Sequence, residues 1–216
     1  MKNFIMLAAL LSLVSSCGSS SKEKEVRTFD KDYKVVDASE KSIPDWIDTP
    51  EKGESESKAK GNRYFVNESA NIQKRLCIKS AEARATSRIA SEIAQFMKNS
   101  YAEATQDGED EVTSYMQEQL AQEAQSFIVG ASVVSTYWEK RAYKEDMGAD
   151  ANKTEYNCFA LVRMSKKNLE KAVNKSRAKL VDGLEDPEVK KKTNTALEDV
   201  ASKFSSLDKK VELTEE

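Results

Sequence analysis

Histidine is absent from all 216 residues of the chain. Because histidine is the commonest general acid–base and a leading metal ligand near neutral pH, its absence removes the usual route to both kinds of site. Of the three cysteines, Cys77 and Cys158 lie far apart without CxxC neighbours, which excludes a Cys/His zinc site. There is also no GxSxG, no phosphate-cradling glycine loop and no HExxH. The sequence therefore predicts a protein that is not an enzyme, with no catalytic residues, no metal and no cofactor.

Long apolar runs and concentrated positive charge are equally scarce. No stretch beyond the N-terminus approaches the roughly 20 apolar residues that a transmembrane helix needs. The net charge is −3, whereas nucleic-acid binding draws most of its affinity from a concentrated basic face. Charged residues make up 33% of the chain and aromatic residues 7%. We therefore expect no nucleic-acid partner, and a modest core covered by long, solvated helices.

What the chain does have is a cysteine at an abrupt change of composition. Lys2 precedes an uncharged run from Phe4 to Val14, which is followed by Ser15, Ser16 and Cys17 and then by serine and charge. The run is too short to span a bilayer but suits the apolar region of a signal peptide. A packed cysteine is not expected here, because nothing on its C-terminal side could pack around it.

Val14-Ser15-Ser16-Cys17 resembles the lipobox of bacterial lipoproteins. The resemblance implies cleavage before Cys17, lipid transfer to its thiol and acylation, including by palmitate, of the new amino terminus; two or more chains anchor a protein stably. Gly18 follows Cys17 where enteric bacteria use Asp as an inner-membrane retention signal, so the outer membrane is favoured. An ordinary secretory signal cut near Ser16, which leaves a free thiol, is the alternative.

Composition divides the chain into four parts. Residues 1–16 are the predicted signal peptide, and residues 17–43 read as a flexible tether, although "VRTFDKDYKVV" within it could form a short strand. Residues 44–182 form the predicted domain, and residues 183–216 form a C-terminal helical extension. Trp46 is interpreted as a plug packed on the domain rather than as a ligand platform.

Within the domain, the patterns predict a strand at 63–69, a long helix from about 70 to 104, a second helix, and a hairpin of two strands ending in "TEYNCFALVRMS". Two apolar stripes at 100° per residue run along the long helix. The main stripe contains Ile72, Leu76, Ala83, Ala90, Ile93, Ala94, Met97 and Tyr101, and the second contains Ile78, Ala85, Ile89 and Phe96. The fold class is therefore α+β, a long helix packed on a three-stranded antiparallel sheet, with additional helices after the second strand and at the C-terminus.

The two remaining cysteines are predicted to be free thiols. On the helical wheel Cys77 lies about 140° from Ile72, away from the main stripe and beside Arg84 and Arg88. A disulfide needs Cα atoms within about 7 Å, which a helix turning Cys77 away from the sheet would not supply.

After Gly183, a capped helix beginning at Asp186-Pro187 carries a nearly heptad apolar repeat to Val211. Packing on its own domain is favoured over a coiled-coil seam with a partner.

Several stretches in order resemble the LPP-twenty family of bacterial outer-membrane lipoproteins, which is related to flagellar lipoproteins of the FlgP type. They are the lipobox, "IPDWI", "SAEARATSRIASEIAQFM", "IVGASVVSTYWEK" and "YNCFALVRMSKKNLEKAV". The resemblance covers roughly residues 43–182 and implies a dodecin-like arrangement. The family's glycine after the first strand is missing here. No catalytic residue can be carried over from the family, and Cys17 is the only site residue.

The sequence thus predicts a non-catalytic lipoprotein of the cell envelope, lipid-anchored at the outer membrane with its domain in the periplasm or at the cell surface. It would act as a structural or assembly component of the cell envelope, for example in a flagellar or other envelope complex, through self-association or a protein partner. One alternative is a small-ligand binder or carrier with Tyr137 and Trp138 as its candidate platform. Another is a periplasmic activator of a cell-wall enzyme.

Overall fold

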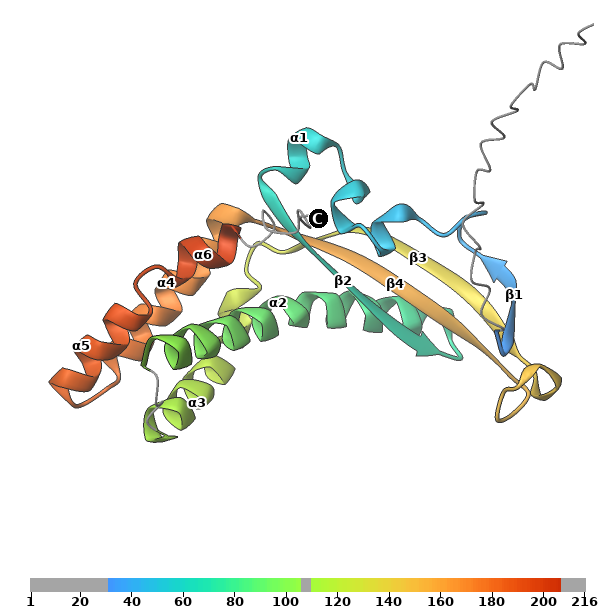
Figure 1. The fold of residues 1–216 in the computed structure, drawn as a ribbon. Helices are drawn as coiled ribbons and strands as arrows, with labels where there is room; N and C mark the ends of the chain where they lie inside the picture. The colour runs from blue at the N-terminus through green and yellow to red at the C-terminus, as the bar shows by residue number, and fades with distance from the viewer. Residues whose placement is uncertain (1–30, 106–109, 207–216) are drawn as a thin grey trace, which may run out of the picture. The chain divides into compact units, whose positions relative to one another are not determined.

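Four antiparallel strands form one sheet in the computed structural model, which describes residues 31–105 and 110–206 (Figure 1). The strands are β1 (Tyr33–Ala38), β2 (Asn62–Asn71), β3 (Ser132–Tyr143) and β4 (Lys153–Ser165). Their order across the sheet is β1-β3-β4-β2, and each neighbouring pair is antiparallel. Strands β3 and β4 are the predicted hairpin, and β1 and β2 are the two edges.

The helices follow the predicted order for the centre of the chain, with β2 followed by a long helix, a second helix and the hairpin. They are α1 (Glu56–Ala59), α2 (Lys74–Thr105), α3 (Asp110–Phe127), α4 (Lys166–Asp182), α5 (Pro187–Ala196) and α6 (Val200–Ser206). Helix α2 runs beneath β2 and β4, whereas α1 lies on the other side of the sheet (Figure 1). Short 3-10 turns occupy Asp45–Ile47, Pro50–Gly53 and Glu145–Met147.

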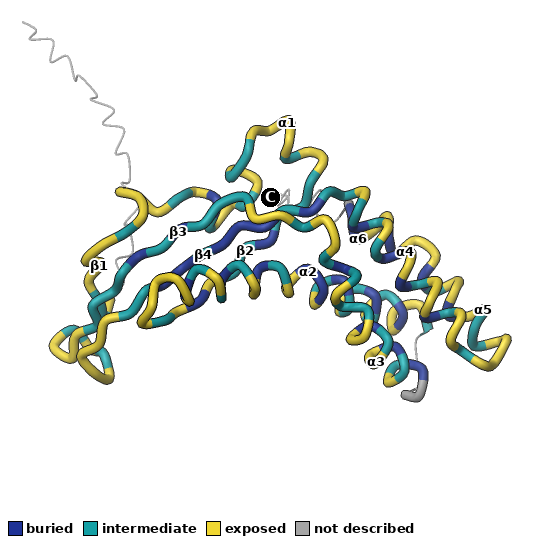
Figure 2. The backbone as a smooth tube through the Cα atoms, turned by 180° about the vertical axis from the view of Figure 1, so that it is seen from behind, coloured by how far each residue is buried: buried dark blue, intermediate teal, exposed yellow. Residues whose placement is uncertain are grey.

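Strand β4 lies inside the sheet, between β3 and β2, and its residues have apolar partners on both faces. Alternate residues of a strand point to opposite faces. Cys158, Ala160 and Val162 belong to the core on the α2 side, whereas Phe159 and Leu161 belong to a second cluster on the other side. Figure 2 shows β4 buried along much of its length, in contrast to the exposed α1.

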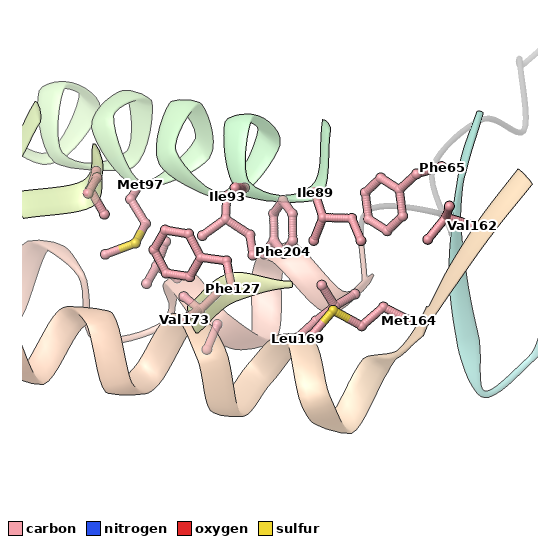
Figure 3. Close-up of a cluster of buried hydrophobic side chains, with 14 of the residues drawn as sticks. Phe65, Ile89, Ile93, Met97, Phe127, Val162, Met164, Leu169, Val173 and Phe204 are labelled. Carbon is pink, nitrogen blue, oxygen red and sulfur yellow. The ribbon is translucent and has the colours of Figure 1, made fainter. Parts of the chain in front are cut away.

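The main core lies where the second half of α2 meets the sheet and the other helices. Figure 3 shows α2 side chains, including Ile89, Ile93 and Met97, among residues from both ends of the chain. Their labelled neighbours are Phe65, Phe127, Val162, Met164, Leu169, Val173 and Phe204. Burial of such side chains supplies most of the favourable free energy of folding, at roughly 25 cal/mol per Å² of apolar surface.

The buried line on α2 differs from both predicted stripes. It follows steps of four residues: Cys77, Ala81, Ala85, Ile89, Ile93, Met97 and Tyr101, with Ala90 beside it. A step of four turns the line by about 40°, so six steps carry it roughly 240° around the helix. The cause is a change of partner, because α2 contacts β2 and β4 and also contacts α3, α5 and α6.

Cys77 and Cys158 form a disulfide, so the prediction of two free thiols is wrong. Their Cα atoms lie 5.7 Å apart, and both residues are 0% exposed. That prediction measured the angle of Cys77 from Ile72, which was taken as part of the buried stripe. Helix α2 begins only at Lys74, however, and Ile72 and Leu76 are 75% and 51% exposed. Because Ile72 and Leu76 do not mark the buried side of the helix, Cys77 is free to face the sheet, where it begins the buried line.

The sheet has four strands rather than the predicted three because residues 33–38, within the predicted tether, pair with β3. Tyr33 contacts Tyr143, with 5.4 Å between the ring centroids, and the Arg141 guanidinium lies 4.3 Å from the centre of the Tyr33 ring. These contacts attach a largely exposed segment to the sheet as an edge strand.

The C-terminal residues up to 206 pack on their own domain, as predicted. Ser165 caps α4 by accepting a hydrogen bond from the Asn168 amide, and Asp186 caps α5 ahead of Pro187. The predicted single last helix is interrupted after Ala196, where Leu197 turns into the core, so α6 lies against α4. Phe204 of α6 is 1% exposed and contacts Phe96 of α2.

Candidate functional site

Cys17, the predicted lipidation site, lies outside the described residues. The remaining candidates lie on or near the sheet face opposite α2. A segment spanning residues 44–59, here called the cover segment, packs across part of this face and contains α1 and two 3-10 turns. The face therefore has an apolar half beneath the cover segment and a polar half towards β1.

Trp46 plugs the apolar half, as predicted. It is 6% exposed and packs with Tyr137 of β3 and Leu161 of β4. Gly53 of the same segment passes so close that a Cβ atom there would lie 2.2 Å from Leu161 Cδ2. The cover segment is thus fitted closely to the sheet, with a tryptophan as its anchor and a glycine at the closest approach.

Tyr137 and Trp138 do not form a common ligand platform. As consecutive strand residues they point to opposite faces of the sheet. Tyr137 is 2% exposed under the cover segment. Trp138 lies on the α2 side, where it meets Tyr156 edge-on at 5.7 Å and the Lys74 ammonium at 4.3 Å from its ring centre. A flat ligand could not contact both rings.

Glu54 fastens the cover segment to the sheet. Its carboxylate accepts hydrogen bonds from Arg163 of β4 at 2.5 Å and from the Tyr64 hydroxyl of β2 at 2.9 Å. Burial raises the pKa of Glu54, but these hydrogen bonds and the Arg163 charge outweigh it and hold the pKa below its usual value of 4.5. Burial and the Glu54 carboxylate raise the pKa of Tyr64 to about 12.

We predict that Glu54→Gln lowers the free energy of unfolding by roughly 1–2 kcal/mol at pH 7, because a charge-assisted pair is lost. A lowered folded-state pKa contributes stability above 4.5 that is lost as the pH falls through the folded-state value. The gap between wild type and variant should therefore close in acid. Urea unfolding from pH 7 to pH 3 measures it. The exposed Glu51→Gln is the control, and a pH-independent gap would contradict the assignment.

Glu139 and Arg141 form a buried ion pair in the polar half of the face. Glu139 is 3% exposed, and Arg141 Nε donates to it at 2.6 Å. The Tyr137 hydroxyl donates to its other oxygen at 3.1 Å. Burial and Glu139 raise the pKa of Tyr137 to about 12. When the Asn157 side-chain amide is oriented so that both its oxygen and its nitrogen are hydrogen-bonded, the oxygen accepts from Arg141 at 2.8 and 2.9 Å.

This network was not predicted, although the sequence carries a signal for it. Tyr137, Glu139 and Arg141 alternate in "YWEKR" and must share one strand face. They bond to one another along β3, and Arg141 also bonds to Asn157 of β4. The network presents no group to a substrate, because both Glu139 oxygens accept bonds from within the sheet.

The described ranges also bear on the kind of site that this protein could hold. In residues 31–105 and 110–206, no group of three or more acidic or cysteine side chains is placed to hold a metal ion. Among the helices of this same part of the chain, none combines the length and the hydrophobicity that a membrane span requires.

Comparison with known proteins adds no relative. No family model, no curated protein and no solved structure matches the chain.

Proposed function

We propose that this protein is a non-catalytic lipoprotein, anchored through Cys17 in the outer membrane, that serves as a structural or assembly component of the cell envelope. The observation that carries the proposal is the sequence around Cys17: a short apolar run, two serines, the cysteine and then a polar segment. The domain then lies in the periplasm or at the cell surface.

The Cys77–Cys158 disulfide supports a location outside the cytoplasm. Structural disulfides form and persist in oxidising compartments such as the bacterial periplasm and are rare in reducing ones. This bond joins the first turns of α2 to the central strand β4, in the middle of the domain. A chain carrying it needs an oxidising environment to complete its fold, which is what export by a lipoprotein signal provides.

The polar clusters support a structural rather than a catalytic role. Glu54 is paired with Arg163, and Glu139 with Arg141. The first pair connects the cover segment to β4, and the second lies along β3 and bonds to Asn157 of β4. The α2 helix crossing an antiparallel sheet also agrees with the resemblance to the LPP-twenty family, whose dodecin-like arrangement and place in envelope or flagellar assemblies we carry over as part of the proposal.

Lipid attachment is tested by Cys17→Ala in the native host, with Gly18→Ala as the neighbouring control. Cells are labelled with a palmitate analogue and then fractionated. The wild type and Gly18→Ala should be labelled and recovered with the outer membrane. Cys17→Ala should be unlabelled, and either unprocessed or released from the membrane, because the acceptor thiol is gone.

Mass spectrometry of the mature N-terminus identifies the processing site independently. A labelled peptide beginning at Cys17 is the expected result. If Cys17→Ala is still processed and remains in the outer-membrane fraction, the anchor lies elsewhere and the proposal fails.

A further inference from the structure

The two edge strands of the sheet, β2 and β1, differ in what covers their outer backbone groups. On β2, the carbonyls of Val66 and Glu68 accept hydrogen bonds from Arg88 at 2.7 Å and Arg84 at 3.2 Å, both from α2. These arginines occupy the edge that another strand would need. In the described residues, no strand or helix does the same for β1, whose Val35 and Val36 are 48% and 57% exposed.

The outer edge of β1 offers backbone groups for pairing. The Asp32 carbonyl and the Ser39 amide bond to the chain of the neighbouring strand, at 3.0 and 2.9 Å. Because successive residues alternate, Tyr33 and Ala38 direct their backbone groups away from β3. The Ala38 amide accordingly finds its partner outside the sheet, in the Asp37 carboxylate at 2.9 Å.

A β-bulge at Val36 makes this edge compatible with a copy of itself. The register of β1 on β3 shifts between Val35 and Asp37. In a regular strand, residues 33 and 38 would direct their backbone groups to opposite edges. The extra residue brings both to the outer edge, so Tyr33 of one copy can pair with Ala38 of another around a two-fold axis.

We propose that β1 pairs antiparallel with β1 of a second copy, which joins the two sheets edge to edge around a two-fold axis between Val35 and Val36. In this register, opposite charges meet and the exposed valines meet. The pairs are Val35–Val36, Lys34–Asp37, Tyr33–Ala38 and Lys31–Glu40, each formed twice. Cross-strand pairs of opposite charge stabilise a sheet, and like charges directly opposite destabilise it.

The charged pair also lies on a single face, as the register requires. Lys34 lies opposite Ala142 and Asp37 lies opposite Lys140, and these two β3 residues are alternate, so Lys34 and Asp37 project to the same side. Edge lysines usually discourage strand addition. Here Lys34 of each copy would face Asp37 of the other, so the charges favour this register over others.

A charge exchange tests the interface, using the mature full-length protein in density-matched detergent and sedimentation equilibrium. The wild type should be a dimer in the micromolar range. Lys34→Asp alone and Asp37→Lys alone should each weaken the dimer by about tenfold or more, because two attractive pairs become repulsive. The double exchange Lys34→Asp with Asp37→Lys should restore it to within about threefold of wild type.

Circular dichroism and thermal unfolding establish that each variant is folded, and Asp45→Lys, an exposed charge change outside β1, is the control. A wild type that is monomeric throughout, or a dimer indifferent to both single exchanges, would overturn the proposal. The proposed contact involves residues 31–40 and not Cys17, so failure of the anchor and failure of the dimer are separate results.

Discussion

Replacing Cys77 and Cys158 together by alanine is expected to lower the free energy of unfolding by about 4 kcal/mol. The bond links residues 81 apart in sequence. In the chain-entropy account, a cross-link closing a loop of that size restricts the unfolded chain by about 4–5 kcal/mol at 25 °C. Small domains are stable by only about 5–15 kcal/mol, so the loss is a large share of the total. Urea unfolding followed by far-UV circular dichroism measures it.

Reduction of the wild type supplies the matched control. With reductant present throughout the titration, the wild-type unfolding midpoint should fall towards that of the double variant, whose own midpoint should not respond. Alkylation of the denatured, unreduced protein followed by peptide mapping should leave Cys77 and Cys158 unmodified and joined. Recovery of both as alkylated thiols would show that the bond is absent and that α2 is rotated from the geometry described above.

The path of α2 explains why the sequence predicted this helix correctly and its buried face incorrectly. Composition and period are local properties, so they revealed a helix of about the observed length. The choice of face assumed straight stripes at 100° per residue, whereas the buried line winds as α2 passes from the sheet to α3, α5 and α6. Ala83, on the predicted main stripe, is exposed, and Ala85, on the secondary one, is 0% exposed.

Strand β1 shows a different limit of the sequence. Residues 33–38, YKVVDA, carry one lysine and one aspartate on either side of Val35 and Val36, and they lie in a longer polar stretch without a clear period, so composition favoured a tether. What holds them is non-local: pairing with β3 and the stacking of Tyr33 against Tyr143 and Arg141. Contacts between residues about 110 positions apart leave no period in the sequence.

The buried Glu139–Arg141 ion pair could be predicted only in part from the sequence. The alternation of Glu139 and Arg141 fixed them to one face, but whether that face was wet or covered depended on how β1 and the cover segment packed. By contrast, Trp46 could be interpreted from the sequence alone, because a large apolar residue in a polar stretch must find apolar neighbours, and it finds Tyr137 and Leu161.

Ala85→Arg is expected to lower the free energy of unfolding by roughly 3 kcal/mol or more, and Ala83→Arg is its matched control. Ala85 is 0% exposed in the core cluster, in line with Cys77 and Ala81 where small side chains let α2 approach β2 and β4. An arginine there must either bury an unpaired charge or push the helix off the sheet. Ala83, two residues earlier, is exposed, so the same substitution should change stability by no more than about 0.5 kcal/mol.

Helix propensity, charge and side-chain size are identical in the two variants, so only the orientation of the position differs. Thermal unfolding of both, under oxidising conditions that keep the Cys77–Cys158 bond, gives the comparison in one experiment. Equal losses would mean that the cost comes from charge on α2 in general. A stable Ala85→Arg with an unstable Ala83→Arg would restore the predicted main stripe and place the sheet against the opposite side of the helix, which would also be incompatible with the disulfide.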